Sequence, residues 1–567
     1  MKNRYILVSV FAVAFSSFTA AAQNLDPTVE VSRAYEGKLM EINKPVRDVN
    51  VPDSVGTFRL DFDYSVFENP YRGAYEFKPY LMSMRPVSDN YKPGTFYLKA
   101  GAGYRLYPEL DLIWSPLMKN GFSMNVYASH ESYVGDYRKI MLDGEAGNAR
   151  SLVRSGKESW DGYDLMSKAG VNGKYDWKAG TFGFNVDYFG LAGRAFSPVL
   201  GGLRDRCYDA VDANLSLASN KGEDAAFFYG VNLNYSFAED KLNLAAANYL
   251  MEHIGSLDAF FGFTLKNGHK LLFDLGGQMA AYRNGLDGYM GKCFLAPRYA
   301  FRKGRWFVDA GVKVDVGLSL KSQQYVYPDV KVSLNAIKDA MDIYVSVTGG
   351  THMNTYASVL SENHYVDFTY DAGFLSFDVE RVKAQLGFKG RISKRFSYDL
   401  RGGYSLPSAM LTPGVSVVGD RLLPVFGYAS YQKAFAALDW RLDTDSFKFD
   451  GTVAYTHSWG FSNSDWLFAP AAVTGNAAFE YNWKRRVFVG VECDFSTGRK
   501  MVSVPTDVAS SVRLPGYADL GVLFEYALNR KLSFWLKGGN LCCMTIQRTP
   551  LYAEGGISAT AGICLNL

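Results

Sequence analysis

Apolar and polar residues alternate along much of this chain, in short segments separated by turn residues. Between residues 229 and 237, one face carries Tyr229, Val231, Leu233, Tyr235 and Phe237, and the other carries Gly230, Asn232, Asn234 and Ser236. A period of two is the pattern of a β-strand. It recurs over residues 447–459 and again over residues 557–567. The sequence therefore predicts many strands, each with one apolar face and one small or polar face.

Turn signals give the number of strands. Ten short segments rich in Gly, Asn, Asp, Lys and Arg are typical of tight hairpin turns, and they fall at residues 119–121, 178–180, 220–222, 266–268, 302–304, 338–339, 393–395, 444–446, 484–486 and 529–531. Eleven mostly longer connections alternate with them, at residues 105–108, 133–161, 194–207, 238–251, 284–290, 319–325, 352–378, 406–428, 459–470, 499–516 and 542–553. These 21 connections would join about 22 strands and leave both ends of the strand region on one side.

Composition favours a membrane barrel over a soluble fold. The chain of 567 residues holds 39 Phe, 38 Tyr, 9 Trp and 55 Gly. Transmembrane β-barrels combine an aromatic, lipid-facing surface with a polar lumen, whereas the small polar faces seen here would not fill the core of a soluble β-sandwich. We therefore predict an all-β fold, an antiparallel transmembrane β-barrel, and keep the sandwich array as the alternative.

The N-terminal residues have the features of an export signal. Lys2 and Arg4 precede a largely apolar stretch and a small-residue site at residues 20–22, which predicts a signal peptide over residues 1–22. The first cysteine is Cys207, so we expect no lipid attachment at the mature N-terminus. Residues 23–93 hold seven of the 19 prolines, which favours an extended segment in the periplasm or docked in the lumen. The barrel is expected over residues 94–567.

The end of the chain resembles a known family. Gly539-Asn540-Leu541, Tyr552, Gly555-Gly556 and the alternating tail through Gly562 are similar to the closing hairpin of TonB-dependent receptor barrels. The strand count also resembles that family. The resemblance implies a Gram-negative outer-membrane protein with both termini in the periplasm. Two departures stand out: the chain ends at Leu567 rather than at an aromatic residue, and residues 23–93 are too short for a full plug domain.

The resemblance also suggests partners. Thr28, Val29, Glu30 and Val31 resemble the short box that TonB captures by strand addition. A chance β-prone stretch in an exported tail is the competing interpretation. The expected partners are outer-membrane lipid and TonB or other outer-membrane or periplasmic proteins. The net charge of +3 gives no reason to expect a nucleic acid.

A barrel this wide needs something to fill it. Three arrangements would do so: the N-terminal segment in the lumen, long loops folded inward, or a bound partner. We expect the first, because an aromatic set would otherwise be exposed; it comprises Phe58, Phe62, Tyr64, Phe67, Tyr71, Tyr75 and Phe77.

A search for chemistry finds no catalytic pattern. The six histidines lack metal-ligand spacing, and no phosphate loop or nucleophile elbow is present, so we expect neither an enzyme nor a cofactor. The connection at 352–378 is the candidate ligand loop, through Tyr365, Phe368 and Tyr370. The leading hypothesis is transport of a solute or nutrient across the outer membrane. The alternative is a non-transporting scaffold in an outer-membrane protein complex.

Overall fold

The computed structural model describes residues 95–104, 108–116, 121–144, 150–197, 202–219, 225–242, 249–318, 323–338, 340–368, 373, 375–393, 395–418, 421–462, 466–502, 512–553 and 556–567. These residues belong to one compact unit. The predicted signal peptide (1–22) and N-terminal segment (23–93) lie outside the described residues, so both boundaries stay predictions.

The described residues are mostly strand. The strands are β1 (Phe96–Gly103), β2 (Glu109–Trp114), β3 (Phe122–Asp143), β4 (Arg150–Asp176), β5 (Gly180–Ser197), β6 (Gly202–Ser219), β7 (Phe227–Leu242), β8 (Tyr249–Thr264), β9 (Lys270–Arg283), β10 (Gly288–Lys303), β11 (Trp306–Leu318), β12 (Gln323–Ile337), β13 (Met341–Met353), β14 (Phe377–Arg391), β15 (Phe396–Val418), β16 (Arg421–Asp443), β17 (Phe447–Ser462), β18 (Val473–Trp483), β19 (Val487–Ser496), β20 (Arg499–Lys500), β21 (Val512–Leu514), β22 (Tyr517–Ala527), β23 (Leu532–Gly539) and β24 (Ser558–Asn566).

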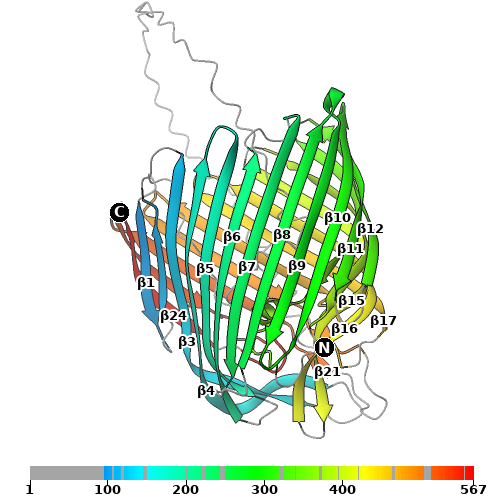
Figure 1. Cartoon of the computed structure of the whole chain (residues 1–567). Helices are drawn as coiled ribbons and strands as arrows, with labels where there is room; N and C mark the ends of the chain where they lie inside the picture. The colour runs from blue at the N-terminus through cyan, green and yellow to red at the C-terminus, as the bar shows by residue number, and fades with distance from the viewer. Residues whose placement is uncertain are drawn as a thin grey trace, which may run out of the picture. The chain divides into compact units, whose positions relative to one another are not determined.

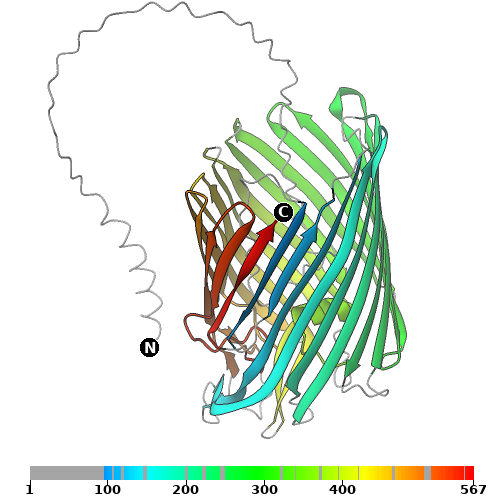
Figure 2. The same cartoon turned by 90° about the vertical axis from the view of Figure 1, so that its left-hand side faces the viewer.

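The strands form a closed barrel of 22 antiparallel strands, which confirms the predicted fold and count (Figure 1). Each strand pairs with the next from β1 to β19, β19 pairs directly with β22, and β22 continues through β23 to β24. β24 pairs with β1 and closes the ring, as the adjacent first and last strands in Figure 2 show. At this seam the Phe96 amide donates to the Leu567 carbonyl at 3.0 Å. β20 and β21 lie outside the ring, where β21 pairs with the start of β4.

The ten predicted tight turns fall between neighbouring strands whose ends meet at one end of the barrel, which we call the short-turn end. Residues 220–222 and parts of the segments 119–121, 338–339 and 393–395 lie outside the described residues. The opposite end is the long-loop end. Here the predicted connections at 133–161 and 406–428 were wrong, because β3, β4, β15 and β16 run through most of these residues and project past the rim (Figure 1). The connections at 194–207 and 238–251 are shorter than expected for the same reason. A strand that projects beyond the belt needs no apolar outward face, so the alternation of apolar and polar residues is interrupted and its sequence resembles a loop.

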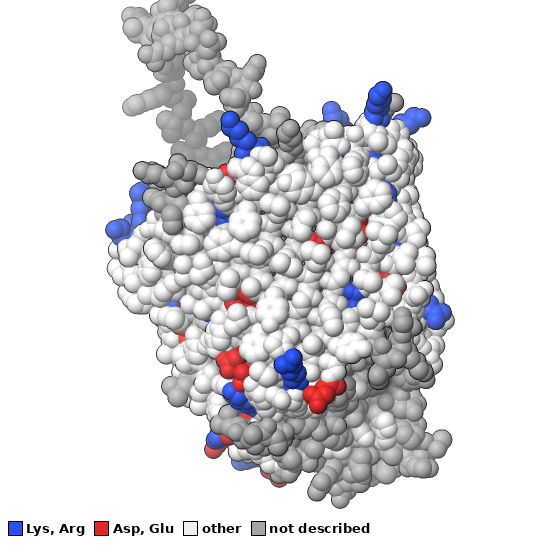
Figure 3. Space-filling model, in the orientation of Figure 1, with Lys and Arg blue, Asp and Glu red and all other residues white. Residues whose placement is uncertain are grey.

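An apolar belt surrounds the barrel. On β7 the outward residues run from Phe227 to Phe237, with Leu233 49% and Tyr235 50% exposed. That length matches the roughly 9 to 11 residues of a tilted transmembrane strand. Figure 3 shows a largely uncharged band, with a few charged atoms within it and more charged side chains toward its ends. The belt thus places the lipid-facing surface nearer the short-turn end.

Helix is scarce in the described part of the chain. It holds one α-helix, α3 (Tyr356–Glu362), and one 3-10 helix, η2 (Lys266–Gly268). No helix among the described residues is long and apolar enough to cross a membrane.

The belt can be tested on two neighbouring residues of β7. Leu233 faces outward at the middle of the belt, so Leu233→Arg should lower the free energy of unfolding by about 2 to 4 kcal/mol in a lipid bilayer. Asn232→Arg should cost far less, because that side chain faces the lumen. Reversible urea unfolding in vesicles measures both. Equal losses for the two variants would contradict the assigned faces.

Candidate functional site: two loops folded into the barrel

The connection between β13 and β14 folds into the barrel over its described residues, 354–368, 373, 375 and 376; we call this connection the inner loop. Its apolar side chains, Tyr356, Val359, Leu360, Val366 and Phe368, are each at most 3% exposed. They pack against the lumen faces of distant strands, on Tyr208, Leu242, Leu250, Ile254, Tyr282, Met290, Phe377 and Val379. The inner loop therefore builds a hydrophobic core where an open barrel would hold water.

A buried carboxylate positions the helix of the inner loop. Thr355 is the N-cap of α3 and forms a capping box with Ser358. Glu252 on β8, 1% exposed, accepts hydrogen bonds from the amides of Tyr356 (2.8 Å) and Ala357 (2.9 Å). These amides are among the four that a helix leaves without an internal partner at its N-terminus. The barrel wall thus supplies a negative group at the positive end of the helix.

Two arginines on β6 hold the rest of the inner loop. The Arg206 guanidinium donates to the carbonyls of His364 and Val366, and it lies 3.4 Å from a carboxylate oxygen of Asp240 on β7. The Tyr356 hydroxyl donates to the same Asp240 carboxylate. Arg204 forms an ion pair with Asp367. We call these contacts, together with Glu252, the latch.

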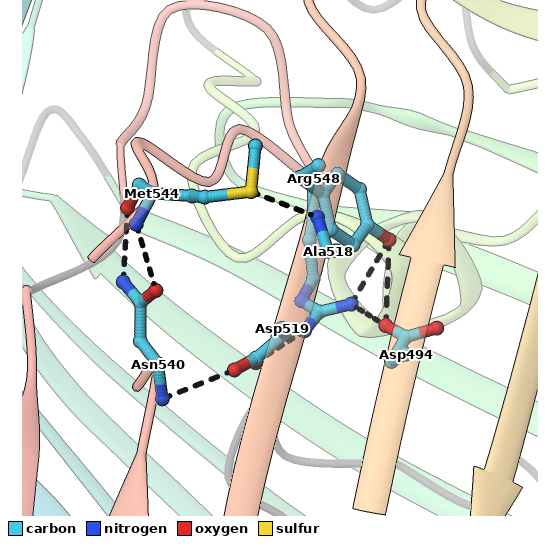
Figure 4. Close-up of polar contacts among 7 residues, drawn as sticks. Asp494, Ala518, Asp519, Asn540, Met544 and Arg548 are labelled. Carbon is cyan, nitrogen blue, oxygen red and sulfur yellow. Dashed lines mark hydrogen bonds and ion pairs between the residues drawn. The ribbon is translucent and has the colours of Figure 1, made fainter. Parts of the chain in front are cut away.

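The connection between β23 and β24, residues 540–557, is anchored by a third arginine, Arg548 (Figure 4). We call it the closing loop. Arg548 donates to Asp519 (3.0 Å), to the Tyr517 hydroxyl (3.0 Å) and to Asp494, so it bridges β22 and β19. Its guanidinium also lies 4.9 Å from the centre of the Tyr517 ring. The Asn540 amide donates to Asp519 at 3.1 Å, which fixes the start of the loop.

The two loops touch through an aromatic stack. The Tyr365 ring of the inner loop lies parallel to the Tyr552 ring of the closing loop, with centroids 4.0 Å apart. The Tyr365 hydroxyl donates to Asp164 on β4 at 3.2 Å, and the Tyr137 hydroxyl donates to the same carboxylate at 2.6 Å. The inner loop, the closing loop and the projecting β3–β4 hairpin therefore form one connected layer.

Two of the predicted ligand residues, Tyr365 and Phe368, lie in this layer. Phe368 is 3% exposed and packs edge-on against Tyr356, while Tyr365 is partly exposed in the stack. Tyr370 lies outside the described residues, as do Thr28–Val31 and the aromatic set of residues 58–77. Contact of Tyr365 or Phe368 with a ligand stays a prediction.

Sequence reasoning missed the latch residues. Arg204, Arg206, Asp240 and Glu252 stand on the lumen faces of β6, β7 and β8, and each is 9% exposed or less. Their only local signal is charge at alternate positions near the ends of strands. That pattern equally fits a solvated lumen, so it does not identify an anchor.

The lumen wall away from the two loops carries paired charges. Arg298 on β10 lies 2.5 Å from Asp274, 2.6 Å from Asp309 and 3.7 Å from Asp329. On the opposite wall, Lys99 forms an ion pair with Glu109. Among the described residues, no group of three or more His, Cys, Asp or Glu side chains is arranged to hold a metal ion.

Solved structures with the same fold are transporters and receptors. The siderophore receptor PiuA of Acinetobacter baumannii aligns with a TM-score of 0.57 and 10% identity over 84% of this chain and 82% of its own. The FrpB iron transporter of Neisseria meningitidis (F5-1 variant) gives 0.63 and 10% over 84% and 82%. The copper transporter OprC gives 0.58 and 9% over 84% and 81%. These neighbours are TonB-dependent receptors with 22-strand barrels. No protein-family model matches the sequence, and no curated protein matches it significantly.

Removing Arg206 should release the inner loop. In Arg206→Met, Asp240 keeps a buried charge without its cation, and two carbonyls lose their donors, which typically costs about 3 to 5 kcal/mol. Amide hydrogen exchange over residues 354–368 should rise sharply. Arg194→Met is the matched control, because the Arg194–Asp205 ion pair is exposed and such pairs contribute about 1 kcal/mol or less. Unchanged protection in Arg206→Met would show that the latch does not hold the loop.

Acid should also weaken the inner loop. Burial, with a smaller contribution from Arg206, lowers the pKa of His364 to about 3, so the docked loop holds this ring neutral. The undocked ring titrates near 6.5, and docking should therefore lose stability as the pH falls below about 6.5. Amide exchange at pH 7.5 and pH 5 measures the effect. His364→Asn should remove this loss, and any remaining pH dependence should have the opposite sign, because burial raises the pKa of the latch carboxyls Asp240 and Glu252; an identical pH dependence would exclude His364.

Proposed function

We propose that this protein moves a solute or nutrient across the outer membrane, with access at the long-loop end controlled by the inner and closing loops. The observation that carries the proposal is the latch. A barrel used only as a rigid wall needs no loop layer held by buried ion pairs. The neighbours with the same fold, described as iron, siderophore and copper transporters, support a transport role.

The latch is held by opposing free-energy contributions, which is what a loop that opens and closes requires. Each buried ion pair pays a large desolvation cost that its Coulomb attraction only partly offsets. The inner loop is therefore held by a balance of large opposing terms together with its apolar packing. A ligand or partner that offers other contacts to Arg206 or Asp367 would shift that balance, because a two-state element responds to any differential affinity.

Orientation follows from loop asymmetry. Outer-membrane barrels have short turns on the periplasmic side and longer loops outside. We assign the short-turn end to the periplasm, which puts both ends of the barrel region there. TonB contact through Thr28–Val31 and narrowing of the lumen by Phe58–Phe77 belong to the same proposal. They require Val29→Pro to abolish energised uptake and deletion of residues 24–93 to raise conductance.

A scaffold role is the second candidate. It is favoured by the hairpins β3–β4 and β15–β16, which project beyond the belt and share an apolar cluster formed by Leu152, Val415, Phe468, Met501, Val512 and Leu514. Such a rigid platform could carry another protein on the cell surface. A scaffold requires the loop layer to stay closed permanently.

Single-channel conductance in planar bilayers separates the two roles. We expect the wild type to conduct weakly and Arg206→Met combined with Tyr365→Ala to conduct several-fold more, since both the latch and the stack with Tyr552 are lost. Arg194→Met should behave as the wild type. A double variant whose inner loop exchanges freely while its conductance stays unchanged would favour the scaffold.

A further inference from the structure

A row of neutral amides crosses the lumen wall away from the latch. Cross-strand pairing places five asparagines side by side on five successive strands: Asn125 on β3, Asn172 on β4, Asn185 on β5, Asn214 on β6 and Asn234 on β7. The register continues to Ser256 on β8 and Gln278 on β9. We call these seven residues the amide row.

The amide row faces the lumen. Val186, Leu215 and Leu233, which adjoin asparagines of the row along the chain, are exposed on the outside of the barrel. Because side chains alternate along a strand, the asparagines point inward. Asn234 stands six residues along β7 from Asp240 of the latch, or about 20 Å at the rise of a strand. At β8 the row comes closer to the inner loop, because Ser256 is one lumen position from Ile254, which packs against that loop.

Several polar atoms of this wall lack a protein partner. Asn125 and Asn172 hydrogen-bond each other at 2.9 Å. In contrast, the Oδ1 atoms of Asn185, Asp187 and Asn232 are buried and accept no hydrogen bond. Buried acceptors without a donor are costly unless water or a ligand satisfies them. The wall thus offers unused acceptors on Asn185, Asp187 and Asn232, while the side-chain amides of Asn125 and Asn185 donate to Asn172 and Asp187.

The amide row is uncharged, and this property indicates which class of ligand it would bind. None of its seven members is ionisable, whereas elsewhere the lumen wall is lined by ion pairs such as those of Arg298 and Lys99. The neighbouring row toward the latch adds Asp187 and Asp212, which are in register with each other. Amides and carboxylates together match vicinal hydroxyl groups, which both donate and accept. The next residue in the same register is a cation, Lys292 on β10, which pairs with Gln278, but its ammonium group already donates to the Thr351 carbonyl.

We propose that the amide row binds a neutral carbohydrate, an oligosaccharide lying across β3 to β9. Neighbouring strands stand about 4.8 Å apart, a spacing close to that of successive rings in a linear oligosaccharide. The Tyr127 ring lies over Gly170, one lumen position from Asn125 and Asn172, where it offers an apolar surface to a sugar face. The proposal names the substrate class of the transport role and rests on that role.

Isothermal titration of the purified full chain in detergent tests the site without any transport step. The probes are maltohexaose and cellohexaose, with a galacturonate hexamer as the charged counterpart. We expect saturable binding of at least one neutral probe and at least tenfold weaker binding by Asn185→Ala/Asn214→Ala, because two hydrogen bonds are lost. Asn476→Ala is the control, a lumen amide on β18 outside the row, and it should bind within about twofold of the wild type.

The outcomes are distinct. Absence of binding to both neutral probes up to millimolar concentrations overturns the proposal, as does equal affinity in the row variant and the wild type. Tighter binding of the galacturonate hexamer, or of a neutral Ser-Gly hexapeptide, assigns the row to another ligand class and also overturns it. Conductance is measured without sugar, so its result stands whatever the titration shows. Sugar binding with no conductance would reject transport and leave the site in place.

Discussion

The closed ring of backbone hydrogen bonds is the constraint on which the rest of this structure depends. Lipid offers no partners to peptide groups, so a membrane-spanning sheet must pair every strand and leave no edge. Here the pairing of β1 with β24 provides that closure. Once the ring is closed, alternation along each strand forces one face outward to lipid and the other inward to the lumen. The apolar belt and the polar lumen are two results of the same geometry.

Closure of the ring leaves a wide lumen, and the loops fill part of it. A ring of 22 strands encloses more space than its own inward side chains fill. The inner loop brings apolar residues into that space, and the wall supplies buried charges to satisfy its backbone. Arg206 binds carbonyl groups, and Glu252 binds amides at the start of α3. Polar groups of the wall thus serve as partners for a segment that would otherwise carry unsatisfied peptide groups into the interior.

The same wall divides into two kinds of surface. Near the long-loop end its charges are taken up by the loops, whereas β3 to β7 present uncharged amides in register with one another. The contrast matters because a charge buried in an ion pair is already occupied, while an amide with an unused acceptor can still bind a solute. The lumen therefore combines a region that the inner and closing loops fill with a region whose polar side chains still have unpaired acceptor atoms.

The sequence by itself determined the strand faces, the tight turns and the strand count. These are local properties, since a turn at residues 266–268 or an alternating run at 229–237 depends only on its own residues. The lengths of the outer hairpins could not be predicted, because β3 and β4 lose their apolar face beyond the membrane.

Only the tertiary structure decided what fills the lumen. Arg206 and His364 are separated by 158 positions along the chain, and no local pattern in either segment indicates the contact. The amide row is similar: its five asparagines have irregular spacing in the sequence, and they align only because successive hairpins set the register of five strands. The alternation of apolar and polar residues is a property of each strand's own sequence. Contacts across the barrel depend on how the closed ring brings distant strands and loops together.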